Sequence, residues 1–154
     1  MQEKYYLTKD KFEELKKEQE YLTTIKREEI AKDLERAKML GDLKENAEYH
    51  EARANQATIE ERIFKLAAIL KSALVVSRKK NDIVEIGSTV LIKKDKDLSE
   101  KEFCILGSEE TNLGGGKISH QSPLGSCLMG KKKGDKVKCK TPSGSVEYTI
   151  LDIK

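Results

Sequence analysis

The chain has 154 residues, of which 37% are charged and 5% are aromatic, and it contains no tryptophan. Its net charge is +3, and acidic and basic residues are balanced in both halves, which excludes a broadly basic nucleic-acid-binding surface. This length suits one or two small domains without a deep enzyme cleft, and the high charge content favours long solvated helices over one compact globule.

The first predicted element is a helix from about residue 8 to residue 39. Leu15 and Leu22 follow a heptad rhythm, and the apolar pattern then shifts phase through Ile25 and Ile30. No proline interrupts this stretch. We therefore expect one long helix whose apolar seam is irregular in the middle.

The second predicted helix begins near Tyr49. Small, apolar or long side chains recur there at alternating spacings of three and four residues, the pattern of a coiled-coil seam. The seam positions are Tyr49, Ala52, Gln56, Ile59, Ile63, Leu66, Leu70 and Ala73. Gly41 is the only glycine before Gly87, so the chain is expected to reverse at residues 41–49. The two helices should form an antiparallel hairpin on the order of 45 Å long.

The C-terminal half has short alternating runs typical of strands, separated by Gly, Pro, Asp and Ser. These runs are STVLIKK, EFCIL, KVKCK and VEYTILDI. The stretch 122–129, with Pro123 near its start, predicts a short helix between two of them. We expect an α+β fold with a coiled-coil arm at 1–76, a linker at 77–85 and a β-rich domain with one short helix at 86–154.

The cysteine content indicates the compartment. Cys104, Cys127 and Cys139 are odd in number and widely spaced, which is poor material for a disulfide framework or a metal knuckle. This usage fits a reducing cytosol. The chain has neither an apolar signal core nor a run approaching the roughly 20 apolar residues of a membrane span. A soluble, cytoplasmic protein without a membrane partner is predicted.

The turn segment 41–49, GDLKENAEY, concentrates Asp42, Glu45 and Glu48 between the two helices. The spacing Asp-x-x-Glu is a variant of the capping box, with Asp42 as N-cap and Glu45 at the third position of the second helix, and spacing alone favours this role. Carboxylates at the end of a helical arm are also suited to carrying metal ligands into a site on another molecule.

Three segments of the sequence resemble the bacterial Gre transcript cleavage factors, and the resemblance spans the whole chain. They are GDLKENAEYHEAR at 41–53, ISHQSPLGSCLMGKKKGDKV at 118–137 and TPSGSVEYTI at 141–150. Members of that family combine an N-terminal antiparallel coiled coil with a C-terminal FKBP-like domain. The resemblance implies a transcription elongation factor whose C-terminal domain docks on RNA polymerase. Its arm would pass through the secondary channel and stimulate cleavage of RNA in backtracked complexes.

The same resemblance assigns roles to residues of the turn. Asp42 and Glu45 match the acidic pair of the family, which implies that they donate to the second Mg²⁺ of the polymerase active site without binding metal tightly in the free protein. Lys44 and Arg53 resemble positions close to the RNA 3′ end, although a simple balance of the neighbouring acids explains them equally well. Asn46 matches the motif and has no assigned role.

In the C-terminal domain, Ser122, Pro123 and Gly125 resemble the polymerase-docking region of the family. Without the resemblance, these residues read as a plain turn into a short helix. The lysines at 131–133 fit steering toward an acidic partner, and they also fit an ordinary solvated loop.

Three other functions fit parts of the pattern. An inhibitory paralogue would enter the same channel without promoting cleavage, and the presence of both Asp42 and Glu45 argues against it. A prolyl isomerase normally uses an aromatic-lined pocket, and Phe103 and Tyr148 are the only aromatic residues after Phe64. A coiled-coil adaptor would depend only on the helical seam. We therefore expect a monomeric accessory factor that is not itself an enzyme.

Overall fold

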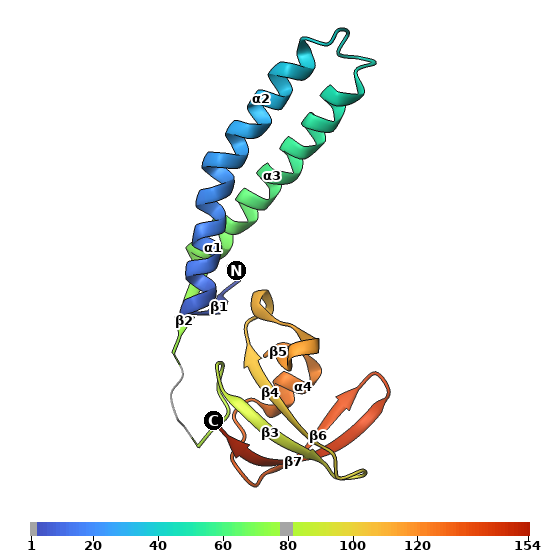
Figure 1. Cartoon of the computed structure of the whole chain (residues 1–154). Coiled ribbons are helices and arrows are strands. Elements are labelled where there is room, and N and C mark those ends of the chain that lie inside the picture. The colour runs from blue at the N-terminus through green and yellow to red at the C-terminus, as the bar shows by residue number, and fades with distance from the viewer. Residues whose placement is uncertain (1–2, 78–81) are drawn as a thin grey trace. The chain divides into compact units, whose positions relative to one another are not determined.

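The computed structural model describes residues 3–77 and 82–154 and shows an α+β fold (Figure 1). The chain divides into two compact units, Phe12–Ser72 and the combination of Met1–Lys11 with Ala73–Lys154. The first unit is a helical hairpin and the second is built around a curled β-sheet. Among the residues described, no helix is long and apolar enough to cross a membrane.

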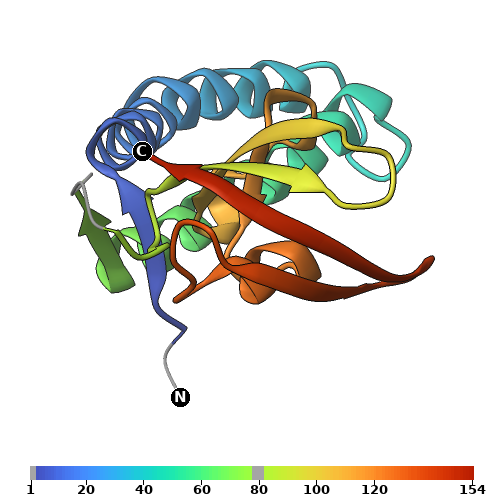
Figure 2. The same ribbon diagram turned by 90° about the horizontal axis from the view of Figure 1, so that it is seen from below.

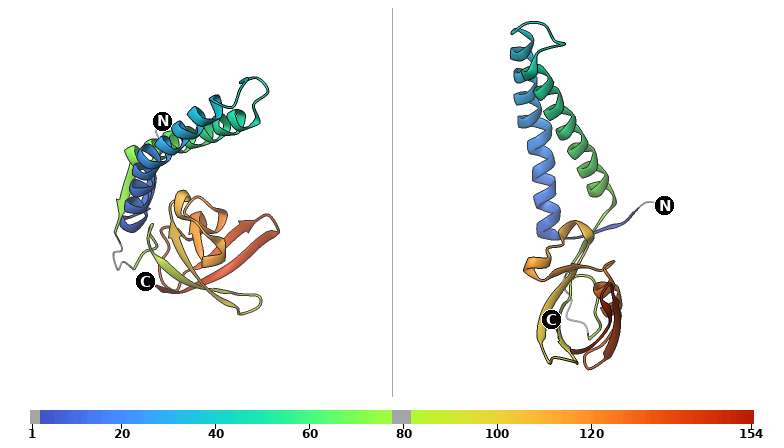
Figure 3. Two further views of the ribbon diagram at one scale, coloured as in Figure 1. Left: turned by 45° about the horizontal axis from the view of Figure 1, so that its top comes forward. Right: turned by 90° about the vertical axis from the view of Figure 1, so that its right-hand side faces the viewer.

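The hairpin consists of two long helical segments that lie side by side in both panels of Figure 3. The outgoing segment is α1 (Lys9–Tyr21), a π-helical turn (Leu22–Lys26) and α2 (Arg27–Lys38) in direct succession. The returning segment is α3 (Ala47–Ser72). Its 26 residues extend about 39 Å at roughly 1.5 Å per residue. The predicted antiparallel hairpin is confirmed.

The π-helical turn explains the phase shift in the first helix. A π turn accommodates one extra residue, so the helix beyond it rotates by about 100° relative to an uninterrupted α-helix. Leu15 before the turn and Ile30 after it are both buried, whereas Ile25 inside it is 51% exposed. The hydroxyl of Thr24 donates a hydrogen bond of 2.7 Å to the carbonyl oxygen of Glu20. The turn therefore keeps the apolar residues on both sides of it on the face of the first helix that packs against α3.

The seam of α3 follows the predicted positions for most of its length. Ala52, Ile63 and Leu66 are buried, as the heptad pattern predicts. At the end of the helix, Ile69 is fully buried and Leu70 is only half-buried, so the buried stripe moves by one residue there.

Two arginine–glutamate pairs connect the helices and fix their register. Arg27 donates to both carboxylate oxygens of Glu60 at 2.8 Å, and Arg62 donates to both oxygens of Glu18 at 2.7 and 2.8 Å. The hydrogen bonds from Arg27 lower the pKa of Glu60 below its usual value. Because the pairs are largely solvated, their bidentate geometry contributes more to register than to stability.

The second unit contains a five-stranded sheet with the order β5-β4-β3-β7-β6. Its strands are β3 (Thr89–Lys94), β4 (Glu100–Leu106), β5 (Lys117–Ser119), β6 (Lys136–Thr141) and β7 (Gly144–Ile153). All neighbours are antiparallel except β4 and β5, and β6 and β7 form the red hairpin of Figure 2. The four predicted strands are confirmed. The fifth, β5, was not predicted because three residues are too few to show a strand alternation.

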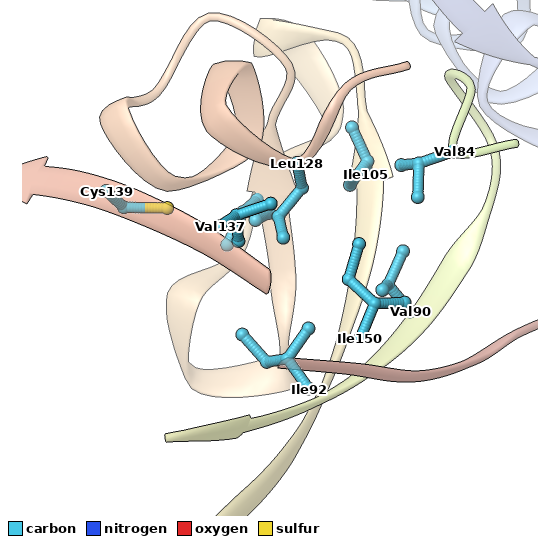
Figure 4. Close-up of a cluster of buried hydrophobic side chains, with 9 residues drawn as sticks. Val84, Val90, Ile92, Ile105, Leu128, Val137, Cys139 and Ile150 are labelled. Carbon is cyan, nitrogen blue, oxygen red and sulfur yellow. The ribbon is translucent and has the colours of Figure 1, made fainter. Parts of the chain in front are cut away.

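An apolar core holds this unit together, and its side chains converge from several elements (Figure 4). The cluster comprises Val84, Val90, Ile92, Ile105, Ile118, Leu128, Val137, Cys139 and Ile150. The predicted short helix is present as α4 (Pro123–Leu128), and it contributes Leu128 to the core. Two 3₁₀ turns, Ser108–Glu110 and Leu113–Gly115, lie between β4 and β5.

The N-terminal strand belongs to the second unit. β1 (Tyr5–Thr8) pairs in parallel with β2 (Ala73–Val76). A Cβ atom at Gly107 would overlap the carbonyl oxygen of Tyr6, so the absence of a side chain permits this close approach. The rings of Tyr6 and His120 pack edge to face with centroids 5.3 Å apart.

The limits of the two units therefore differ from the domain limits expected from the sequence. The sequence placed residues 1–76 in the arm, whereas Met1–Lys11 and Ala73–Val76 group with the sheet. Both strands have four residues and adjoin long helices, so periodicity alone did not separate them from the helix ends. The linker expected at 77–85 lies partly outside the described residues and stays a prediction.

Two of the three cysteines are joined in the structure. Cys127 of α4 and Cys139 of β6 form a disulfide with their Cα atoms 5.7 Å apart, and Cys104 is free. The expectation that the cysteines would not provide a disulfide is therefore wrong for this pair. The reason is tertiary, because α4 packs against β6 and brings together residues separated by 12 positions in the chain.

Candidate functional site

Asn46 organises the loop that joins α2 to α3. Its Oδ1 accepts a hydrogen bond of 3.1 Å from the backbone N–H of Tyr49, which makes Asn46 the N-cap of α3. Its Nδ2 donates a hydrogen bond of 2.6 Å to the carbonyl oxygen of Ala37 in α2. One side chain thus caps the second helix and ties the loop to the end of the first.

The capping role proposed for Asp42 and Glu45 is wrong. The helix begins at Ala47, and the Oδ1 of Asp42 accepts instead a 3.1 Å hydrogen bond from the backbone N–H of Lys44, forming an Asx-turn inside the loop. Asn46 takes the cap position because it directly precedes the first residue of the helix, and its amide also donates to Ala37, which a carboxylate cannot do. Both acidic side chains are consequently left outside the helix cap.

The acidic residues of the loop share one region of its surface. Asp42, Glu45 and Glu48 are exposed and line a shallow open hollow. Its other lining residues are Leu40, Asn46 and Ala47. Carboxylate oxygens are the donors that Mg²⁺ prefers, and that ion takes about six oxygen ligands. The hollow can therefore supply part of a coordination shell, with the remaining oxygens coming from another molecule or from water.

Within the described ranges, no group of three or more His, Cys, Asp or Glu side chains is arranged to hold a metal ion. The loop backbone gives the donors of the acidic hollow a defined scaffold, since Asn46 and the Asx-turn of Asp42 fix both of its ends.

His50 is a further loop contact that the sequence reasoning missed. Its Nε2–H donates a hydrogen bond of 3.0 Å to the carbonyl oxygen of Lys44, and because a carbonyl only accepts, this contact requires the proton on Nε2. The rings of Tyr49 and His50 pack edge to face at 5.9 Å. His50 lies within the segment 41–53 that resembles the Gre factors, but that resemblance assigned it no contact.

Lys44 and Arg53, the predicted basic contacts, are both exposed. Arg53 donates from Nη1 to the Oε1 of Gln56 at 2.8 Å. Neither cation forms an ion pair with a residue that the structure describes. Direct pairing with the acids of the loop therefore does not account for them, and their contact with RNA stays a prediction.

The segment around α4 has a clear structural role. The Oγ of Ser122 accepts a hydrogen bond of 3.0 Å from the N–H of Gly125 and donates one of 2.7 Å to the carbonyl oxygen of Ser119. Pro123 occupies the first turn of the helix. Gly125 is buried, and a Cβ there would overlap the Ser119 carbonyl oxygen. Ser122 and Gly125 shape the helix, while Pro123 is exposed on its surface.

The two aromatic residues of the sheet, Phe103 and Tyr148, do lie together. They line a hollow of about 120 Å³ with Ile92 and with the charged side chains of Lys94 and Lys101. Pockets for small molecules usually measure about 300 to 1,000 Å³ and are mostly apolar. The size and charge of this hollow do not favour a prolyl isomerase site.

Two family models together match nearly the whole chain. "Transcription elongation factor, N-terminal" matches residues 5–75, and "Transcription elongation factor, GreA/GreB, C-term" matches residues 79–154. The chain belongs to the GreA/GreB family of transcription elongation factors. The N-terminal GreA/GreB match includes the helical hairpin with its acidic loop, and the C-terminal match includes the sheet and α4.

Relatives within the GreA/GreB family place the chain nearest to GreA. The transcription elongation factor GreA of Clostridium acetobutylicum is 44% identical over 155 residues, covering 99% of this chain and 98% of the relative. GreA of Nautilia profundicola is 48% identical over 147 residues, covering 94% and 90%. The solved structure of GreA factor homolog 1 (Gfh1) of Thermus thermophilus is 26% identical over 99% of both chains, with a TM-score of 0.46. The resemblance seen in the sequence is confirmed, and the protein is a transcription elongation factor.

Proposed function

We propose that this elongation factor binds RNA polymerase and inserts its helical hairpin into the secondary channel to stimulate cleavage of RNA in backtracked, arrested complexes. The observation that carries the proposal is the shared exposure of Asp42 and Glu45 in one hollow, where Asn46 relieves them of capping the helix. Membership of the GreA/GreB family supports the same reading. The polymerase supplies the main catalytic site, so the chain acts as an accessory factor in the cytoplasm.

The chemistry explains why an acidic pair is useful. In a two-metal site, Mg²⁺ ions activate the attacking water and stabilise the leaving oxygen of a phosphodiester. Asp42 and Glu45 would hold the second ion together with oxygens of the polymerase and the RNA, because two carboxylates supply only part of the shell. Each carboxylate can also accept a hydrogen bond from water and orient it.

The basic residues near the acidic hollow complement the role of the acidic pair. Lys44 and Arg53 would hold phosphates at the 3′ end of the extruded RNA. The contact of Arg53 Nη1 with Gln56 leaves further guanidinium N–H groups free to donate to phosphate oxygens.

Docking is assigned to the second unit and to the surface around α4. Pro123 is exposed there, while Ser122 and Gly125 hold the helix in shape from within. The exposed lysines 131–133 would steer the unit toward an acidic surface of the polymerase.

The decisive experiment compares isosteric variants in a cleavage assay with purified polymerase stalled in a backtracked complex. Asp42→Asn and Glu45→Gln remove charge while keeping shape, and each should slow stimulated cleavage by on the order of 100-fold. Glu61→Gln changes an exposed acid of α3 outside the hollow and should behave as wild type. Polymerase affinity should be unchanged in all three variants.

The outcomes separate the competing functions. Wild-type cleavage by both Asp42→Asn and Glu45→Gln would refute the metal-donor role. A wild-type protein that binds polymerase and protects the RNA from cleavage would instead identify an inhibitory factor of the same channel.

A further inference from the structure

The disulfide lies in the part of the second unit that carries the proposed docking helix. Cys127 is half-buried in α4, and Cys139 is fully buried on β6 within the apolar core. The bond closes a loop with a sequence separation of 12 residues, and this loop contains lysines 131–133. Cys104 on β4 is free.

We propose that Cys127 and Cys139 form a reversible oxidative modification site, a dithiol–disulfide pair that controls the rigidity of α4 and thereby the affinity for polymerase. The last step rests on the proposed function. Disulfides in cytosolic proteins, when present, are usually transient and redox-sensing. A pair that couples a core strand to a partner-facing helix is well placed for such a role.

The different burial of the two cysteine residues sets the order of the chemistry. A small disulfide such as oxidised glutathione can reach the thiolate of half-buried Cys127, which attacks it, forms a mixed disulfide and releases one glutathione thiol. The thiolate of Cys139 then attacks the sulfur of Cys127 and releases the second glutathione thiol. Two cysteine thiols are oxidised, one glutathione disulfide is reduced, and the two cysteine protons pass to the released thiolates.

The cross-link adds a covalent restraint at the C-terminal end of α4. The N-terminal end is fixed by Ser122, whose side chain bonds both Ser119 and Gly125. The C-terminal end is held by burial of Leu128 and by the bond from Cys127. Loss of the disulfide therefore leaves this end of the helix held by Leu128 and by backbone hydrogen bonds, without a covalent link to β6.

Contacts outside the disulfide keep the unit folded when the bond is reduced. The N–H of Val84 donates a hydrogen bond of 2.8 Å to the carbonyl oxygen of Lys131. The N–H of Gly130 donates one of 2.9 Å to the carbonyl oxygen of Val84. These bonds do not depend on the sulfur atoms. Reduction should consequently loosen α4 and its loop without unfolding the sheet, so that both redox states are functional forms of one protein.

A preorganised surface binds its partner more tightly, because less conformational freedom is lost on binding. We expect the oxidised protein to bind polymerase about three- to tenfold more tightly than the reduced protein. Its melting temperature should also be higher by several degrees, since the cross-link restricts the unfolded chain.

The first experiment equilibrates the full chain in buffers from fully reduced to fully oxidised glutathione, with alkylation of thiols and mass spectrometry. Cys127 and Cys139 should lose and regain reactivity together at intermediate buffer compositions, while Cys104 remains reactive. The Cys104→Ser variant, which keeps the pair, should give the same transition. A bond that persists in fully reduced glutathione, or that never forms in the oxidised buffer, would overturn the reversible site.

The second experiment measures polymerase affinity for oxidised and reduced wild-type protein, each freed from reagent under anaerobic conditions. Cys127→Ser should bind with the weaker affinity in either buffer. Equal affinity of the two wild-type forms would overturn the regulatory step. Binding by neither form, together with normal thiol titration, would overturn the proposed function and its regulation while leaving the modification site intact.

Discussion

The side-chain Nδ2 of Asn46 donates a 2.6 Å hydrogen bond to the carbonyl oxygen of Ala37, and this bond links the end of α2 to the start of α3. The Ala37 carbonyl lies in the last turn of its helix, where it also accepts a hydrogen bond of 3.1 Å from the backbone N–H of Leu40. Asn46 therefore adds a second hydrogen bond to an acceptor at one helix end and satisfies a backbone donor at the other. The acidic loop is held between these two contacts.

Replacing Asn46 should disorganise the acidic loop while sparing the rest of the hairpin. Asn46→Ala loses both hydrogen bonds and should destabilise the hairpin by about 1 to 2 kcal/mol, a typical cost for an N-cap. Asn46→Asp keeps the cap acceptor and loses only the donor to Ala37, so it should recover most of the stability. Thermal unfolding followed by circular dichroism measures both. Equal loss in the two variants would show that the bond to Ala37 matters more than the cap.

Deletion of one residue from the π turn should leave the packing of the first helix intact. Removing Thr24 should convert Leu22–Lys26 to regular α-helix and keep Leu15 and Ile30 on the same face, because the π turn holds the one extra residue. We expect an unchanged or higher melting temperature. Deletion of exposed Ala31 from α2 is the matched control, and it should lower the melting temperature by rotating the helix beyond it by about 100°. A destabilised Thr24 deletion would show that the turn itself contributes to stability.

Shortening the hairpin tests whether the acidic loop must reach a fixed depth. The pairing of Arg27 with Glu60 sets the helix register, so residues 27–33 and 54–60 are matched heptads. Their joint deletion should shorten the hairpin by about 10 Å and keep the seam paired. We expect a helical protein that binds polymerase and does not stimulate cleavage.

Circular dichroism and a binding assay provide the controls for the shortened hairpin. If the protein is folded and bound yet cleaves RNA at the normal rate, the delivery of carboxylates by the hairpin is refuted. A coiled-coil adaptor would tolerate this change, so the result also distinguishes that class of function.

Gly125 should prove structurally indispensable. Gly125→Ala places a methyl group on the Ser119 carbonyl oxygen, which must displace α4 from β5, and we expect a loss of more than about 2 kcal/mol of unfolding free energy. Gly114→Ala is the matched control, since its Cβ would make only an ordinary 3.4 Å contact with the Asn112 side chain. Chemical denaturation of both variants checks this. A stable Gly125→Ala protein would show that the Ser119 carbonyl can move aside without loss of the packing of α4.

Much of the helical unit was predictable from the sequence because its signals are local and repeated. The spacing of Ala52, Ile63 and Leu66 identifies the buried face of α3 directly. The phase shift near Ile25 is equally visible, and the π turn is its structural cause. The acidic loop was located by the same means, between the end of one periodic stretch and the start of the next.

The sequence predicted the wrong cap for α3 because two possible capping residues lie within a few positions of each other. Asp42 and Glu45 have capping-box spacing, whereas Asn46 makes the cap and also reaches Ala37. The second contact exists only when the two helices are already antiparallel. The spacing of residues along one segment therefore does not predict this contact.

The sequence by itself thus determined the hairpin, the acidic loop, four of the five strands of the main sheet and the family, since each depends on periodicity or on a contiguous motif. Tertiary structure alone decided the Cys127–Cys139 bond, the pairing of β1 with β2 and the need for glycine at 107 and 125. These features arise where segments distant in sequence come within van der Waals or bonding distance. Such proximity is a property of the packed fold, because no residue's local preference specifies which distant backbone will lie against it.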